Sequence, residues 1–82
     1  MNITMYSTTT CAFCHALAGW LDQQNITYTK KNTDEDEAAL AEFMSVNEGN
    51  MAVPFTIIKD DSGRETKILG FDQPKFKQVL GV

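Results

Sequence analysis

The sequence predicts an α/β domain that occupies residues 1–82 as one unit, with the order strand, helix, strand, helix, strand, strand, helix. Three observations support this fold class. Four short segments alternate apolar and polar residues, and three longer ones place apolar residues at helical spacing. The strand–helix–strand start implies a parallel pair, and the later strand–turn–strand implies an antiparallel hairpin. The four strands should therefore form a mixed sheet.

The first half of the chain holds two strands around one helix. Asn2–Thr8 alternates and is predicted to be a strand, with Ile3 and Met5 on one side and Thr4 and Tyr6 on the other. A helix is expected over Ala12–Gln24, ended by Asn25, and a second strand over Ile26–Lys31. The apolar positions of the helix are Phe13, Ala16, Leu17, Trp20 and Leu21.

The second half begins with an acidic run, Thr33–Glu37, which suits the positive end of a helix dipole. The helix that follows should turn Ala39, Leu40, Phe43 and Met44 inward and end in Asn47–Asn50, with Gly49 as a left-handed cap. Strands are predicted over Phe55–Lys59 and Glu65–Leu69, joined by a turn over Asp60–Gly63. The last helix should be capped by Asp72, with Pro74 in its first turn and Phe76, Val79 and Leu80 facing inward.

Several single residues need no function to explain them. We expect Trp20, Phe43 and Phe76 in the core, together with Met44 and Met51 as packing residues. His15, the only histidine, is expected to face solvent without a catalytic role.

Composition limits the function classes. Seven basic against eleven acidic residues give a net charge of −4, with no basic stripe, so nucleic acid is not an expected partner. Both cysteines fall in one motif rather than in a disulfide framework, which favours a reducing cytosol. No signal-peptide pattern or long apolar run is present, so a soluble, cytoplasmic monomer without membrane contact is predicted.

The chemistry of this chain is concentrated in Cys11 and Cys14, which stand three apart where a strand gives way to a helix. At a helix start the first sulfur can accept unpaired backbone N–H groups, while the second lies inside the first turn. Cys11 is therefore the predicted nucleophile and Cys14 the resolving thiol. We expect the pKa of Cys11 to lie below that of a free thiol, at about 5 to 7.

The motifs resemble those of the glutaredoxins. The segments that carry the resemblance are Y-S-T-T-T-C-A-F-C before the first helix, A-V-P before the third strand and L-G-F-D-Q before the last helix. Residues 42–54 look most like mycoredoxins, whereas Gly70-Phe71 resembles the corresponding turn of NrdH-redoxins. The resemblance implies a thioredoxin-like fold with helices on both faces of the sheet and thiol–disulfide oxidoreductase activity.

It also implies a substrate groove and partners. The groove residues would be Thr10, Phe13, Ala52, Val53, Pro54, Gly70, Phe71 and Asp72. The Val53–Pro54 bond is expected to be cis, so that Val53 offers its backbone to an incoming disulfide beside Cys11. No bound cofactor or metal is required. Glutathione or mycothiol would act as co-substrate, disulfide-containing or S-thiolated proteins as substrates, and a small thiol or a flavoprotein reductase as electron source.

Three departures from the family pattern bear on the chemistry. Thr8 stands where a lysine is usual, which removes a cation that would help to hold a thiolate. Ala12 replaces a proline at the first helical position, and Leu69 replaces a glycine that lets the backbone approach glutathione.

Three other functions share the same residues. Zinc binding would need a second ligand pair, which the chain lacks. Cys11 to His15 also spells the C-x-x-C-H motif of c-type haem attachment, with Met44 and Met51 as nominal axial ligands, but this motif normally occurs in exported, helical proteins. An iron–sulfur scaffold, in which Cys11 would bridge a cluster between two protomers, is the remaining alternative.

Overall fold

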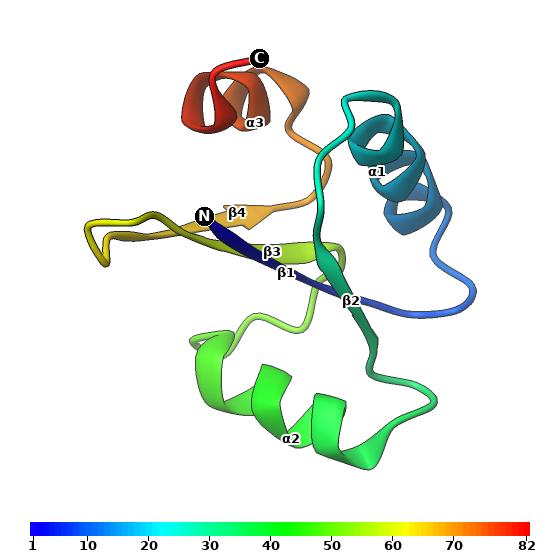
Figure 1. The fold of residues 1–82 in the computed structure, drawn as a ribbon. Coiled ribbons are helices and arrows are strands. Elements are labelled where there is room, and N and C mark those ends of the chain that lie inside the picture. The colour runs from blue at the N-terminus through cyan, green and yellow to red at the C-terminus, as the bar shows by residue number, and fades with distance from the viewer.

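The computed structural model describes residues 1–82 and contains three helices and four strands in the predicted order. The elements are β1 (Asn2–Ser7), α1 (Ala12–Gln23), β2 (Thr29–Asn32), α2 (Glu37–Val46), β3 (Phe55–Lys59), β4 (Glu65–Leu69) and α3 (Gln73–Leu80). Figure 1 shows α1 and α3 on one face of the sheet and α2 on the other. None of the three helices combines the length and the apolar character that crossing a bilayer would need.

The sheet is mixed, with the strand order β2-β1-β3-β4. β1 pairs in parallel with β2 and antiparallel with β3, which in turn pairs antiparallel with β4. β1, β2 and β4 therefore run in the same direction, and β3 runs against them. As a result, the residues that follow β1, β2 and β4 and those that precede β3 all gather at one edge of the sheet.

The two faces of the sheet carry separate apolar clusters, as the alternation in β1 predicts. Ile3 and Met5 face α1 and α3, whereas Tyr6 faces α2. The first cluster is completed by Leu17, Trp20, Leu21, Ile58, Ile68 and Phe76, and the second by Phe43, Phe55 and Ile57. The prediction that Trp20, Phe43 and Phe76 belong to the core is confirmed.

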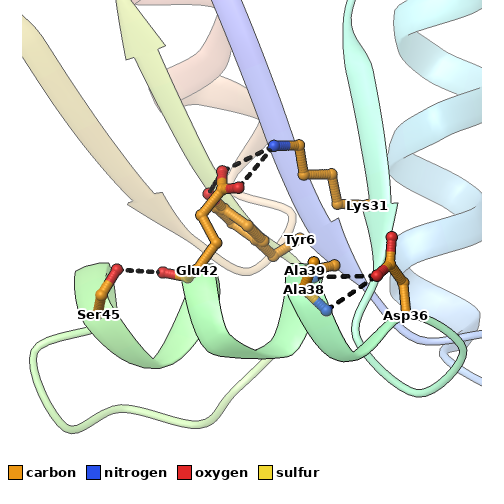
Figure 2. A network of polar contacts seen from close by, with 7 residues as sticks. All are labelled: Tyr6, Lys31, Asp36, Ala38, Ala39, Glu42 and Ser45. Carbon is orange, nitrogen blue, oxygen red and sulfur yellow. Dashed lines mark hydrogen bonds and ion pairs between the residues drawn. The ribbon is translucent and has the colours of Figure 1, made fainter.

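Capping and turn chemistry explain where the elements end. Asp36 accepts hydrogen bonds from the backbone N–H groups of Ala38 (2.9 Å) and Ala39 (3.3 Å) and so begins α2 (Figure 2). Asp72 accepts from the N–H of Lys75 at 3.3 Å, which confirms it as the cap of α3. The Asp60–Gly63 turn is also confirmed, since Asp60 Oδ1 accepts from the N–H groups of Ser62 and Arg64.

The predicted start of the second strand was wrong. β2 begins at Thr29 rather than Ile26 because Asn25 takes a left-handed conformation (φ 57°) and the N–H of Ile26 bonds back to Leu21 O at 3.0 Å. The chain must then cross from the end of α1 to the sheet. Ile26 and Tyr28 pack against the first apolar cluster from this connection instead of pairing in the sheet.

The predicted apolar face of the second helix was too wide. Ala39 and Phe43, four residues apart, are the buried residues of α2, whereas Leu40 and Met44 are exposed by 39% and 55%. Met51, also expected to pack, is 56% exposed. A short helix against one face of a small sheet buries only a narrow stripe, so neighbouring apolar residues remain in solvent. For the same reason Ala16 lies on the outer side of α1.

The end of α2 differs in detail from the prediction. Asn47 is the C-cap, and the left-handed conformation begins at Glu48 (φ 54°) and continues at Gly49 (φ 85°). The buried side chain of Asn47 holds this turn because its Oδ1 accepts from the N–H of Gly49 at 2.9 Å. Gly49 is left-handed as predicted, but the helix has already ended before it.

Glu42 joins three elements, as Figure 2 shows. The buried hydroxyl of Tyr6 on β1 donates a hydrogen bond to Glu42 Oε1, and Lys31 Nζ on β2 lies 2.8 Å from both carboxylate oxygens. Burial and the neighbouring Glu42 carboxylate raise the pKa of Tyr6. Hydrogen bonds from Lys31 and Tyr6 lower the pKa of Glu42. The network therefore anchors α2 to the strand that leads into the cysteine motif.

Candidate functional site

The cysteine motif lies at the sheet edge where β1, β2 and β4 end. After Ser7 the chain makes a tight turn, closed by a hydrogen bond from the N–H of Cys11 to Thr8 O at 3.3 Å. Cys11 has an extended backbone (φ −86°, ψ 110°) and is the N-cap of α1. The first sulfur is thus placed at the helix N-terminus, where backbone N–H groups have no partner within the helix.

Cys11 and Cys14 are joined as a disulfide, with their Cα atoms 5.2 Å apart. The N–H of Cys14 donates to Cys11 Sγ at 3.1 Å, as expected for a sulfur that caps a helix. Cys14 is fully buried, whereas Cys11 is half-buried. A reagent that arrives from solvent therefore meets Cys11 first.

The loop before β3 forms the second side of the site. The Val53–Pro54 bond is cis, which confirms the prediction. Val53 O lies 3.8 Å from Cys11 Sγ, so the backbone edge of Val53 lies beside the outer sulfur. The N–H of Gly70 donates to Pro54 O at 2.8 Å and ties the end of β4 to the same loop.

The other predicted groove residues divide into two groups. Thr10, Phe13 and Ala52 are exposed beside the cysteines or the proline loop, and the Phe13 side chain reaches 69% exposure. The side chains of Phe71 and Asp72 make contacts within the protein. The Phe71 ring lies 5.9 Å from that of Trp20, and Asp72 caps α3.

Two contacts to the turn before Cys11 were missed from the sequence. Asp34, in the connection from β2 to α2, accepts hydrogen bonds from the N–H of Thr9 at 3.0 and 3.2 Å and from its hydroxyl. These bonds from Thr9 lower the pKa of Asp34. On the other side, His15 Nε2 lies 3.0 Å from Thr9 O. The acidic run signalled a helix start, which Asp36 provides, and gave no sign that Asp34 reaches across the sheet edge.

The two hollows of the molecular surface are open to solvent and lie away from the cysteines. One, of about 320 Å³, lies between β2 and α2 and is lined by residues that include Lys30, Glu35 and Asp36. The other, of about 210 Å³, lies on the α2 face of the sheet beside Tyr6 and Val46. Neither includes a cysteine. The residues around Cys11 lie at an exposed edge of the molecule, with Thr10, Phe13 and Ala52 open to solvent.

Comparisons with known proteins agree with this geometry. The glutaredoxin family model matches residues 3–62. Mycoredoxin 1 from Corynebacterium glutamicum is 42% identical over 53 residues, a match that spans 65% of this chain and 65% of the relative, slightly under two thirds of each.

Solved structures show the same fold. The glutaredoxin-like protein NrdH-redoxin from Escherichia coli superposes with a TM-score of 0.74 at 22% identity, over 96% of this chain and 95% of that one. Methanoredoxin from Methanosarcina acetivorans gives 0.80 at 25% identity, over 99% and 85%. The sequence match over most of the chain, on a thioredoxin-like fold with the cysteine pair at the start of α1, shows that this chain belongs to the glutaredoxin family.

Proposed function

We propose that this chain is a thiol–disulfide oxidoreductase in which Cys11 attacks and Cys14 resolves. The observation that carries the proposal is the asymmetry of the pair. Cys11 is half-exposed at the N-terminus of α1 and accepts the Cys14 N–H at 3.1 Å, whereas Cys14 is fully buried behind it. Such an environment stabilises a thiolate on the outer sulfur and shields the inner one from solvent.

The reaction proceeds by two thiolate exchanges. The Cys11 thiolate attacks one sulfur of a substrate disulfide, forms a mixed disulfide and releases the other substrate sulfur as a thiolate. The Cys14 thiolate then attacks Cys11 Sγ, which releases the second substrate thiol and leaves the Cys11–Cys14 disulfide present in this structure. Two electrons from a thiol or a dithiol reductant restore the reduced protein.

A small thiol offers a second route. When the mixed disulfide on Cys11 is with glutathione or mycothiol, a second molecule of that thiol can release it, so Cys14 is not needed. We propose one of these two thiols as co-substrate, disulfide-bonded or S-thiolated proteins as substrates, and a flavoprotein reductase as an alternative electron source, all in the cytoplasm. The backbone edge of Val53, 3.8 Å from Cys11 Sγ, would align the incoming disulfide, with Thr10, Phe13 and Ala52 around it.

The test separates the two cysteines. Cys11→Ser should abolish both de-thiolation of a mixed disulfide and reduction of a protein disulfide such as that of insulin. Cys14→Ser should keep de-thiolation with the cognate small thiol and lose reductase-coupled reduction of insulin, because only an intramolecular thiol releases a protein substrate quickly.

Cys14→Ala is the matched control. Because Cys14 is fully buried, a serine introduces a buried hydroxyl, and agreement between the two variants assigns the loss to the missing thiol. If both variants lose both activities while circular dichroism shows an intact fold, the protein is an obligate dithiol and the small-thiol route is withdrawn. Haem or cluster absorbance in the freshly purified protein would instead support one of the two binding functions.

A further inference from the structure

Thr9 is an exposed residue whose backbone and side-chain polar groups all have partners from other parts of the chain. Its N–H and hydroxyl donate to the Asp34 carboxylate, with N–H distances of 3.0 and 3.2 Å, and its carbonyl lies 3.0 Å from His15 Nε2. A carbonyl can only accept, so the His15 ring donates. These contacts hold the turn that delivers Cys11 to the start of α1.

The contact with Thr9 also brings the Asp34 carboxylate near Cys11. The turn from Thr8 to Cys11 is closed by a backbone hydrogen bond, so the Asp34 carboxylate on Thr9 lies within about 10 Å of Cys11. None of the three ion pairs of the molecule involves Asp34. Residues 1–29, which include both cysteines, contain no lysine or arginine.

We propose that Asp34 is a positioning and specificity-determining residue, which holds the turn before Cys11 and favours cationic and neutral disulfides over anionic ones. The inference rests on the proposed oxidoreductase function. An unneutralised carboxylate close to the site attracts a positively charged substrate and repels a negative one, both as it approaches and in the mixed disulfide on Cys11. The Thr9 contacts give the same residue its positioning role.

The magnitude follows from Coulomb's law. At about 10 Å across a protein surface, one charge changes the rate by roughly two- to three-fold for each unit of substrate charge. Between a substrate that presents an ammonium and one that presents a carboxylate, the difference is two units. Removal of the Asp34 charge should therefore change the ratio of the two rates by about four-fold or more at low salt.

Three symmetric disulfides supply the probes: cystamine with ammonium groups, bis(2-hydroxyethyl) disulfide without charge, and dithiodiglycolate with carboxylates. Pre-reduced protein is mixed with each, quenched with an alkylating reagent and assayed by mass for loss of its two thiols. Each turnover oxidises Cys11 and Cys14 to their disulfide and reduces the probe to two thiols. Because each variant meets the same probes, the intrinsic reactivities of the probes cancel when the cationic-to-anionic ratio of a variant is divided by that of the wild type.

Asp34→Asn removes the charge but keeps an oxygen that can accept from Thr9, whereas Asp34→Ala removes both. Glu37→Gln is the matched control, because Glu37 is exposed, lies in the same acidic run and makes no contact with Thr9. We expect Asp34→Asn to lower the cationic-to-anionic ratio about four-fold, and the rate with the neutral probe reports any change in thiol reactivity that is common to all three probes. Asp34→Ala should also slow the neutral probe, and the charge effect should fade in 0.5 M salt.

The three outcomes below test the oxidoreductase function, the specificity role of Asp34 and its positioning role separately. If the wild type fails to oxidise with the neutral probe, the proposed function is wrong. If it reacts but Asp34→Asn leaves the charge ratio unchanged, or Glu37→Gln lowers it as much, the specificity role of Asp34 is refuted. If Asp34→Ala reacts with the neutral probe as fast as the wild type, the positioning role is refuted.

Discussion

Replacement of Glu42 by alanine should destabilise the protein more than replacement of either of its two partners, Tyr6 and Lys31. The carboxylate is the acceptor for the hydroxyl of Tyr6, a residue that is only 2% exposed, and it pairs with Lys31, which lies in a more open position. A buried phenol left without an acceptor costs about 1–3 kcal/mol. The ion pair adds less than about 1 kcal/mol, because the side chains of Lys31 and Glu42 are 33% and 43% exposed.

The expected loss for Glu42→Ala is therefore about 2–3 kcal/mol. For a domain of this size each 1 kcal/mol shifts the unfolding temperature by about 4–8 °C, so a decrease of roughly 10–20 °C should be observed. Tyr6→Phe should cost about 1 kcal/mol, because it removes the donor and leaves Glu42 with Lys31 and water. Lys31→Met should cost less than about 1 kcal/mol.

Urea denaturation monitored by the fluorescence of Trp20, the only tryptophan, measures all three variants on the same scale. The pH dependence adds a check of sign. Hydrogen bonds from Lys31 and Tyr6 lower the pKa of Glu42 in the folded state. The ionised carboxylate therefore contributes to the free energy of unfolding at pH values above the usual pKa of a glutamate. The difference in the free energy of unfolding between the wild type and Glu42→Ala should then become smaller as the pH falls below about 4. If Lys31→Met lowers the free energy of unfolding at neutral pH as much as Glu42→Ala does, the reasoning is refuted. The exposed ion pair would then contribute more than the buried hydrogen bond from Tyr6.

Three further predictions concern the thiol and the core. In reduced Cys14→Ser protein, thiolate absorbance against pH should place the pKa of Cys11 below that of a free cysteine because it caps α1, and an ordinary thiol value would contradict this. Phe43→Ala should lower the free energy of unfolding, measured by urea denaturation, by about 3–5 kcal/mol because Phe43 is 1% exposed. Met44→Ala, at 55% exposure, should change it by no more than about 0.5 kcal/mol. Equal losses for the two variants would mean that α2 packs on the sheet through another face. Thr56→Val should be neutral or stabilising by up to about 1 kcal/mol, because the buried Thr56 hydroxyl has no hydrogen-bond partner, and a clear loss in the same assay would indicate a partner.

The site depends on strand direction as much as on the cysteine motif. The parallel pair β1 and β2 brings the residues after Ser7 and after Asn32 to one edge, which allows Asp34 to reach Thr9. β3 runs in the opposite direction and therefore starts at that edge, so Val53 precedes it beside Cys11. The surroundings of Cys11 are therefore built from three separate connections of the chain.

Much of the architecture could be predicted from the sequence because it rests on local chemistry. The alternation in β1 assigned Ile3 and Met5 to one face and Tyr6 to the other, since side chains in a strand alternate strictly. The capping role of Asp72 followed from its place before an apolar helical pattern, and β3 and β4 have the predicted bounds. The position of Cys11 at the start of α1 was likewise readable from spacing.

What the sequence could not decide were the contacts between residues far apart in the chain. Leu40 and Met44 fit a helical apolar stripe as well as Ala39 and Phe43 do, and only the packing of α2 on the sheet left them in solvent. Ile26 fits a strand by composition, but the end of α1 holds it in a connection.

The site divides in the same way. The placement of Cys11 at the start of α1, with Cys14 in the first turn, follows from the sequence, because helix-start chemistry acts over four residues. The hold of Asp34 and His15 on Thr9 arises only in the tertiary structure, because hydrogen bonds between separate connections form once the strands have set the edge where those connections meet.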